Sequence, residues 1–232
     1  MRQIKRIVKK IPLFGYLLKL MYERFFIVDS FQGSSDYWKK RYSSGGNSGC
    51  GSYGGLAKFK AEIINKFVLE NHIDSVIEFG CGDGNQLSYA IYPKYIGFDV
   101  SEVALSLCSR KFDGDESKKF LLDGEYSGQT SDLTLSLDVI YHLVEDEVFD
   151  SYMARLFDSS KKFVIIYSSN NDNVVDARHV RHRIFTSWVN QNRSNWKLIL
   201  RIGNKFPYCE DDESGSFADF YIYEMYAAGA QG

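Results

Sequence analysis

Short apolar runs alternate along this chain with stretches in which apolar side chains recur at helical spacing. The runs are expected to form strands, and they cover residues 75–79, 95–99, 120–122, 132–138, 161–169, 196–202 and 219–226. Helical spacing is clearest at Leu56, Phe59, Ile63, Ile64, Phe67 and Val68 and again at Phe149, Tyr152, Met153, Leu156 and Phe157. A further helix is expected to start near Thr186. This alternation is typical of βαβ units, which build α/β folds.

The first predicted strand leads into a glycine-rich turn. It carries Glu78 near its end and is followed by glycines at alternate positions, Gly80, Gly82 and Gly84. Such a turn suits a place where a ligand touches bare backbone, because a Cβ would collide with it and because the turn requires positive φ. A helix is expected next, presenting its free N–H groups. An ordinary strand–helix turn is the alternative, but the acid, the glycines and the strand together favour a ligand site.

The spacing of these glycines argues against a dinucleotide site. The dinucleotide fingerprint G-x-G-x-x-G would need a glycine where this chain has Asn85. An acid at the strand end also suits a cationic or hydroxyl-bearing ligand better than a pyrophosphate.

Two later strands also end in acids. Asp99 follows the first glycines by about 20 residues, the distance expected for an acid that binds ribose hydroxyls. Ser101 is expected to cap the helix that follows, and helix capping is the alternative role for Asp99. The third strand leads into Asp123, Gly124 and Glu125, where Asp-Gly could also simply form a turn.

Composition limits the class of protein. The chain has 232 residues, which fits one sizeable domain. Its formal net charge of −2 gives no indication of a surface that binds nucleic acid as a whole. Its four cysteines are scattered without a C-x-x-C pair. This pattern argues against a zinc site or a disulfide framework and predicts a cytoplasmic protein without a metal.

The first 27 residues are basic and amphipathic, with seven Lys or Arg against the single acid Glu23. The apolar run from Ile11 to Leu18 is too short to span a bilayer. Such a segment can lie on the inner, anionic face of a membrane, or pack its apolar stripe on the domain or on a partner protein. Both alternatives stay open for the segment 1–32.

Residues 33–55 are rich in glycine and serine but also contain Tyr37, Trp38, Arg41 and Tyr53. Composition alone indicates a flexible linker, but linkers rarely carry such aromatic side chains. We therefore expect a lid over a ligand site, followed by a domain over 56–232.

Two sets of polar residues are expected beyond the carboxyl ends of the strands, where open α/β sheets bind ligands. Asp138 and His142 follow the fourth strand, and His142 is the candidate catalytic base. A cluster over 179–183 holds two histidines and two arginines and is predicted to bind an anion, although it could be a solvated helix start.

The sequence resembles the class I S-adenosylmethionine (SAM) methyltransferases, specifically the branch found among bacterial surface-polysaccharide proteins for O-antigen or capsule. The segments that carry the resemblance are 36–54, 76–87, 97–101, 136–146, 179–188 and 216–224. It implies a Rossmann-like α/β fold with a mostly parallel seven-stranded sheet, helices on both faces and a C-terminal antiparallel strand pair. It also implies SAM as cofactor, with S-adenosylhomocysteine (SAH) as product.

The resemblance and the motifs together give the predicted site. Cofactor-binding residues are Tyr37, Trp38, Arg41, Glu78, Gly80, Cys81, Gly82, Gly84, Asp99, Val100, Asp123, Gly124, Glu125, Leu137 and Asp138. Substrate-binding residues are Tyr53, Lys60, Tyr141, Tyr167, His179, Arg181, His182 and Arg183.

The predicted function is SAM-dependent O-methylation of a surface-glycan precursor, at a sugar hydroxyl or at a phosphate or phosphoramidate group. The substrate would be a small molecule or glycan precursor, expected to be anionic, and no nucleic acid is involved. A non-catalytic scaffold with the same fold is one alternative, and a nucleotide-dependent oxidoreductase is another.

Overall fold

The computed structural model describes residues 31–175, 177–208 and 215–226. Residues 1–30, which make up most of the predicted basic segment, therefore lie outside the described residues. The acidic residues 210–213 also lie outside them. Residues 33–232 form one compact unit by themselves. Within the described ranges, no helix is long and apolar enough to cross a membrane.

A seven-stranded sheet forms the centre of this unit, in the order β3-β2-β1-β4-β5-β7-β6. The strands are β1 (Val76–Phe79), β2 (Tyr95–Asp99), β3 (Lys118–Leu122), β4 (Ser131–Leu137), β5 (Ser160–Ser168), β6 (Trp196–Ile202) and β7 (Asp219–Met225). Strands β1 to β5 are parallel, and β7 runs antiparallel to both β5 and β6. The predicted sheet is confirmed, with strand ends shifted by one or two residues.

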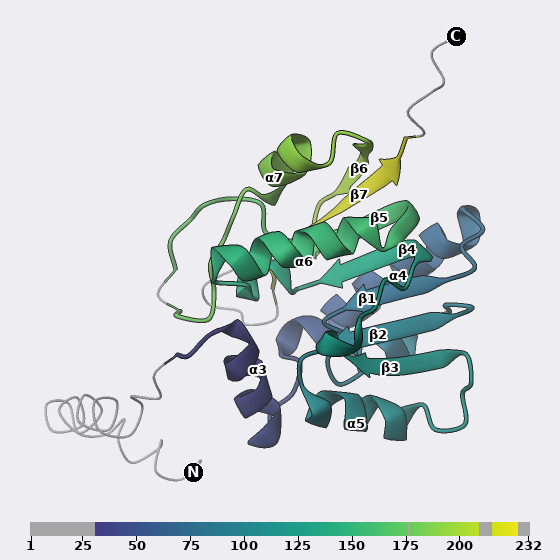
Figure 1. Ribbon diagram of the computed structural model, residues 1–232, viewed down its shortest axis with the longest axis vertical. Helices are drawn as coiled ribbons and strands as arrows, with labels where there is room; N and C mark the ends of the chain where they lie inside the picture. Colours follow the sequence, from purple (N-terminus) through teal and green to yellow (C-terminus); the bar gives the residue numbers. More distant parts are fainter. Residues whose placement is uncertain (1–30, 176, 209–214, 227–232) are drawn as a thin grey trace, which may run out of the picture. The chain divides into compact units, whose positions relative to one another are not determined.

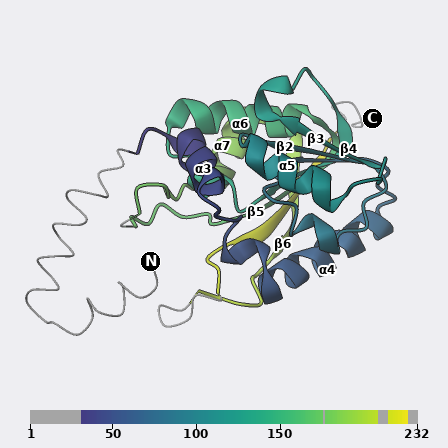
Figure 2. The ribbon, with the colours of Figure 1, turned by 90° about the horizontal axis from the view of Figure 1, so that it is seen from below.

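Helices cover both faces of the sheet, with α4 (Gly54–Glu70) on one side and α6 (Asp146–Asp158) and α7 (Phe185–Asn192) on the other (Figures 1 and 2). Alternate residues of a strand point to opposite faces, so Val76 packs in the core under α4 while Phe79 packs under α6. α5 (Glu102–Lys111) packs in the same core as α4.

The connection from β1 to β2 differs from the prediction. No α-helix follows the glycine-rich turn, and the segment 80–94 contains only a short 3₁₀ turn, Leu87–Tyr89. Its backbone groups are satisfied from outside, because Asn65 of α4 donates to the Tyr89 carbonyl oxygen at 2.8 Å and accepts from the Ile91 N–H at 3.1 Å. The expected array of helix N–H groups is therefore absent from this described segment.

The predicted lid is also more regular than its composition indicates. It opens with α3 (Ser34–Ser43) and continues as a loop that contains a 3₁₀ turn, Cys50–Ser52. The first turn of α3 is fixed by Glu145, whose carboxylate accepts from the Ser34 N–H at 2.8 Å and from the Ser34 hydroxyl at 2.5 Å. A negative charge at a helix N-terminus is favourable, which explains why this segment is helical.

Candidate functional site

A cavity of about 600 Å³ lies at the carboxyl ends of β1, β2 and β4, bounded also by α3 and α6. Many predicted residues line it, namely Trp38, Lys60, Glu78, Gly80, Cys81, Gly82, Asp99, Val100, Asp123, Leu137, Asp138 and His142. The lining also includes residues that were not predicted, among them Ser34, Tyr42, Ser48, Gln86, Val148, Ser151, Tyr152 and Arg155. The topology thus brings together side chains from six separate segments of the chain.

The glycine-rich turn has the positive φ values that the sequence predicted. Gly80 and Gly82 have φ values of 84° and 61°, a left-handed conformation that favours glycine. A Cβ at Gly80 would lie 2.4 Å from Val139, and one at Gly82 would lie 2.3 Å from the Ser48 hydroxyl. The protein's own side chains therefore also exclude these Cβ atoms, and the expected contact with a ligand stays a prediction.

Asp99 fixes the turn and faces the cavity. Its Oδ2 accepts from the Gly82 N–H at 2.9 Å, and its Oδ1 accepts from the Ser101 N–H at 2.9 Å. Burial raises its pKa to about 6. Each carboxylate oxygen has two lone pairs, so both can still accept from a ligand hydroxyl. Ser101 accepts from the Ala104 N–H at 3.3 Å, which confirms it as the cap of α5.

Glu78 lies deeper, in β1, and is 3% exposed. The Tyr95 hydroxyl donates to its Oε2 at 2.7 Å. Burial raises its pKa to about 7, although the Tyr95 hydrogen bond and the nearby Lys60 ammonium oppose this rise. At neutral pH this carboxyl group is close to the midpoint of its titration, so a bound cation would favour its ionised form.

Asp138 has both of its oxygens occupied by protein groups. Lys60 of α4 is fully buried and lies 2.6 Å from Oδ2, while the Tyr141 hydroxyl donates to Oδ1 at 2.9 Å. The Lys60 ammonium also lies 5.2 Å from the centre of the Tyr167 ring. Tyr141 and Tyr167, which were predicted to bind substrate, do not line the cavity; the Tyr141 hydroxyl holds Asp138, and the Tyr167 ring lies beside Lys60. Asp138 itself has a φ of 61°, a strained conformation often found at functional sites.

Gln86 is a cavity residue that the sequence analysis missed. Its Nε2 donates to the Ala57 carbonyl oxygen of α4 at 3.0 Å, which orients the amide. Its Oε1 is buried and has no hydrogen-bond partner among the described residues. A buried acceptor without a partner costs about 1–3 kcal/mol, so this oxygen is suited to a ligand that donates a hydrogen bond.

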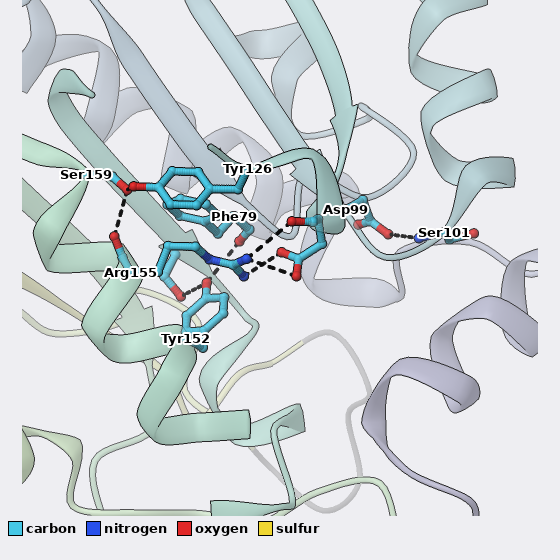
Figure 3. Close-up of polar contacts among 9 residues, drawn as sticks. Phe79, Asp99, Ser101, Tyr126, Tyr152, Arg155 and Ser159 are labelled. Carbon is cyan, nitrogen blue, oxygen red and sulfur yellow. Dashed lines mark hydrogen bonds and ion pairs between the residues drawn. The ribbon is translucent and has the colours of Figure 1, made fainter. Parts of the chain in front are cut away.

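Arg155 is a second missed residue (Figure 3). It reaches from α6 toward the rings of Phe79 and Tyr126, with its guanidinium carbon 4.8 Å and 5.6 Å from their centres. Its two terminal nitrogens pair with both oxygens of Asp123 at 3.0 Å and 2.5 Å. The Asp123 carboxylate was expected to contact a cofactor directly. Since Arg155 pairs with both of its oxygens, its charge is largely neutralised within the cavity wall.

The loop after α3 is fastened to the glycine-rich turn by Asp83. Its Oδ2 accepts from the Ser48 N–H at 3.0 Å and from the Tyr53 hydroxyl at 2.7 Å. The Ser48 hydroxyl in turn accepts from the Asp83 N–H at 3.0 Å. Burial alone would raise the Asp83 pKa, but these hydrogen bonds outweigh it and lower the pKa. Tyr53, a predicted substrate residue, is thus part of a clasp that holds the loop over the turn.

His142 lines the cavity next to Asp138, as predicted. Its Nδ1 lies 2.9 Å from the His179 carbonyl oxygen. Burial lowers its pKa to about 4, so the ring is neutral at physiological pH. A neutral imidazole can accept a proton, which a permanently charged group could not.

The predicted anion-binding role of Arg181 and Arg183 stays a prediction. Both guanidinium groups pair with Asp146 at 2.9 Å, and both donate to the Val144 carbonyl oxygen at 2.9 Å. Arg183 also donates to the Leu143 carbonyl oxygen at 2.5 Å. Neither residue lines the cavity described above. Both line a second cavity of about 610 Å³, together with His182. In this structure, part of their positive charge is balanced by Asp146, the first residue of α6.

The remaining predicted residues lie around the cavity rather than in its lining. His182 is buried with its Nδ1 2.6 Å from the Ser169 hydroxyl, and Glu125 accepts from the Leu122 N–H at 2.7 Å. Arg41 donates to the Asn47 carbonyl oxygen at 2.7 Å and lies over the Trp38 ring. Tyr37, Gly84, Gly124 and His179 are likewise outside the lining.

The missed residues had weak signals in the sequence. Gln86 follows the glycines without any pattern of its own, and Ser48 lies in a stretch of low complexity. Arg155 is a charged position beside the apolar stripe of α6, the one feature that could have marked it. In the described part of the chain, no group of three His, Cys, Asp or Glu residues is arranged to hold a metal.

Known structures with the same architecture are methyltransferases. The N-methyltransferase NodS from Bradyrhizobium japonicum WM9, in complex with SAH, aligns with a TM-score of 0.66 and 9% identity, covering 84% of this chain and 99% of that one. Magnesium protoporphyrin IX methyltransferase (ChlM) from Synechocystis PCC 6803, with bound SAH, aligns with a TM-score of 0.60 and 13% identity, covering 86% of this chain and 98% of that one. The methyltransferase domain of bacterial CtHen1 aligns with a TM-score of 0.59 and 18% identity, covering 75% of this chain and 100% of that one.

No family model matches the sequence, and no curated protein matches it significantly. At these identities the structural likeness shows the fold alone. The chain therefore has the Rossmann-like fold of class I methyltransferases, as the sequence predicted.

Proposed function

We propose that this protein is a SAM-dependent methyltransferase that uses the cavity at the carboxyl ends of β1, β2 and β4. The observation that carries the proposal is the arrangement of Asp99 and the glycine-rich turn. Each oxygen of the Asp99 carboxylate accepts one backbone N–H, from Gly82 or from Ser101, and Asp99 lines the cavity. A carboxylate in this position suits the two hydroxyls of a ribose.

The charge of the cavity favours a cationic cofactor. Its described lining contains five carboxyl groups, Glu78, Asp99, Asp123, Asp138 and Glu147, against the basic side chains Lys60 and Arg155. These two cations pair with Asp138 and Asp123, respectively. SAM carries a sulfonium and an ammonium group, which such a lining attracts. A dinucleotide carries a pyrophosphate, which it repels, so the oxidoreductase alternative is disfavoured.

The residues present fit the cofactor. Asp99 would accept from the ribose hydroxyls, and the unpartnered Gln86 oxygen together with Glu78 would accept from the ammonium group. SAM, when bound, supplies an electrophilic methyl group on a sulfonium. The protein has to hold an acceptor in line with that methyl group and exclude water, and α3 with its clasped loop covers the cavity for this purpose.

Within this proposal we prefer a hydroxyl acceptor to an anionic one. His142 is neutral and lines the cavity, so it can take the proton that a hydroxyl loses on methylation. A phosphate or phosphoramidate acceptor would need a cationic site, and Arg181 and Arg183 are already paired with Asp146. A sugar hydroxyl of a capsule or O-antigen precursor is thus our preferred acceptor. The polysaccharide assignment is supported by the sequence resemblance of the segments named above.

Isothermal titration calorimetry tests the cofactor assignment. We expect SAH and SAM to bind with one-to-one stoichiometry and NAD to give no heat. Asp99→Asn should weaken SAH binding by roughly 10- to 100-fold, since a charge-assisted hydrogen bond is lost. Asp113→Asn, an exposed position after α5, is the matched control and should bind like the wild type. Binding of NAD but not SAH would refute the proposal.

A non-catalytic scaffold would bind SAH in the same way, so turnover must be measured separately. Protein incubated with methyl-labelled SAM and a pool of sugar-nucleotide and lipid-linked sugar precursors should transfer label to an organic product. Binding without transfer to any pool would favour the scaffold.

A further inference from the structure

The His142 ring is enclosed on three sides by aromatic side chains. The Trp38 ring meets it edge-on at 4.9 Å, the Tyr141 ring lies at 4.5 Å, and the His179 ring is nearly parallel to it at 5.6 Å. An imidazole confined in this way has little freedom to flip. Its orientation and tautomer are therefore set by its one backbone contact and by the groups that hold that contact in place.

That contact defines the tautomer of the neutral ring. Nδ1 lies 2.9 Å from the His179 carbonyl oxygen, and a carbonyl oxygen can only accept a hydrogen bond. Nδ1 must therefore carry the hydrogen, which leaves the lone pair on Nε2. Since the ring lines the cavity, Nε2 is the atom that can accept a proton there.

The His179 carbonyl is held by the loop around it. The Tyr37 ring of α3 stacks on the His179 ring at 4.3 Å with an angle of 10° between the planes. The loop also pairs with the backbone before α6, since the Arg181 N–H donates to the Tyr141 carbonyl oxygen at 2.8 Å. Neither Tyr37 nor His179 is among the residues that line the cavity.

We propose that Tyr37 and His179 are positioning residues for His142: the Tyr37–His179 stack holds the carbonyl that fixes the base in its Nδ1–H tautomer. This inference rests on the proposed function, in which His142 accepts a proton. It assigns these two residues a role different from the direct cofactor and substrate contacts that the sequence predicted.

The charged groups around the ring set its proton affinity together with the stack. Arg41 of α3 and the His179 ring disfavour the imidazolium, while Asp138 and the His179 carbonyl favour it. Burial is the largest influence and lowers the pKa to about 4. Opening the stack would admit water, remove part of this penalty, and move the pKa toward the ordinary histidine value of about 6.5.

Nuclear magnetic resonance of the ¹⁵N-histidine-labelled protein tests the proposal without an acceptor. Long-range ¹H–¹⁵N correlation spectra report which ring nitrogen carries the hydrogen, and the missing signal in His142→Gln assigns the ring among the four histidines. We expect a pure Nδ1–H tautomer in the wild type down to about pH 5. Tyr37→Phe, which keeps the stack, should leave the tautomer and pKa unchanged, whereas Tyr37→Leu should raise the pKa by at least one unit.

His179→Leu is the second variant, because it removes the ring but keeps the carbonyl, and it should change the pKa in the same direction as Tyr37→Leu. An Nε2–H tautomer in the wild type, or an unchanged His142 titration in both leucine variants, would overturn the proposal. SAH titrations of the same samples keep the two questions apart. Either of these two results with intact SAH binding in the wild type refutes only this inference, and absent SAH binding in the wild type refutes the proposed function.

Discussion

Burial changes the pKa values of individual side chains in this site. Glu78 and Asp99 are acids whose pKa values burial raises to about 7 and about 6, from ordinary values of about 4.5 and 3.8. A bound cation favours their ionised forms, whereas the empty fold favours their protonated forms. Cofactor binding and folding should therefore depend on pH in opposite directions.

The affinity for SAM should rise with pH. Between pH 5.5 and pH 7.0 both carboxyl groups lose protons, so we expect the dissociation constant to fall by at least about tenfold. Calorimetric titrations at the two pH values measure this change. In Glu78→Gln the dependence should be much weaker, because the group with the higher pKa has been removed. An equal dependence in the variant would show that other groups control the binding.

The stability of the ligand-free protein should show the opposite trend. Because the folded pKa of Glu78 is raised, its contribution to stability is present below about pH 4.5 and is lost as the pH rises through about 7. The free energy of unfolding of the wild type minus that of Glu78→Gln should fall by on the order of 1–2 kcal/mol between pH 5.0 and pH 7.5. Urea unfolding curves of both proteins measure this difference, and a constant difference would contradict it.

The effect of substituting His142 on the methyl-transfer rate distinguishes a hydroxyl acceptor from an anionic one. If the acceptor is a hydroxyl, His142→Gln should lower the methyl-transfer rate by roughly 100- to 10,000-fold while SAH affinity stays unchanged. The exposed residue His72, substituted by Asn because its φ is 51°, is the control and should keep full activity. A rate close to that of the wild type in His142→Gln would instead indicate an anionic acceptor that needs no base.

At the scale of elements, the loop after α3 depends on one carboxylate. Asp83 holds Ser48 and Tyr53, and a further contact runs from the Asn85 amide to the Ser52 carbonyl oxygen at 2.7 Å. The Tyr42 hydroxyl lies 2.8 Å from the Ser48 hydroxyl and ties the same loop back to α3. The whole covering segment is thus coupled to the turn that is proposed to bind the cofactor.

Asp83→Asn should loosen this loop. Replacing a buried carboxylate that accepts three hydrogen bonds should cost about 1–2 kcal/mol and weaken SAH binding several-fold. Hydrogen exchange followed by mass spectrometry should show faster exchange in residues 44–53, with little change in the sheet. Asp113→Asn is again the control, and unchanged exchange in Asp83→Asn would show that the clasp does not hold the loop.

The sequence predicted the helices and strands better than it predicted the contacts between side chains. Apolar patterns located all seven strands and the helices α4, α5 and α6, because burial of one face dictates that pattern. Helix α3 was missed because its stabilising partner, Glu145, is distant in sequence and α3 has no apolar stripe. The charges of Arg181 and Arg183 were visible, but their pairing with Asp146 depends on how two loops meet in space. Side-chain partners of this kind cannot be inferred from spacing along the chain.

At the scale of the whole molecule, residues 33–232 form a compact unit by themselves. The basic segment before them is predicted to bind a membrane surface or a partner protein. A chain that starts at Gly33 should therefore keep its fold and its SAH affinity within about twofold. Circular dichroism, thermal unfolding and calorimetry check this expectation. Loss of SAH binding in the shortened chain would show that the basic segment belongs to the cofactor site.

Binding of the full-length protein to vesicles separates the two alternatives for that segment. If the segment binds membranes, the 232-residue chain should sediment with vesicles that contain anionic lipid, whereas the chain that starts at Gly33 should stay in the supernatant. High salt should release the 232-residue chain from the vesicles. Equal behaviour of the two chains would leave a partner protein as the favoured role.

The central claim is that Asp99 and the glycine-rich turn hold the cofactor at the carboxyl ends of β1, β2 and β4. A crystal structure of the protein soaked with SAH tests it most directly. We expect the ribose hydroxyls within hydrogen-bond distance of the Asp99 carboxylate and the cofactor ammonium on the Gln86 side-chain oxygen. SAH bound elsewhere, or a cavity filled by Trp38 and the loop after α3 while SAH fails to bind in solution, would contradict the account.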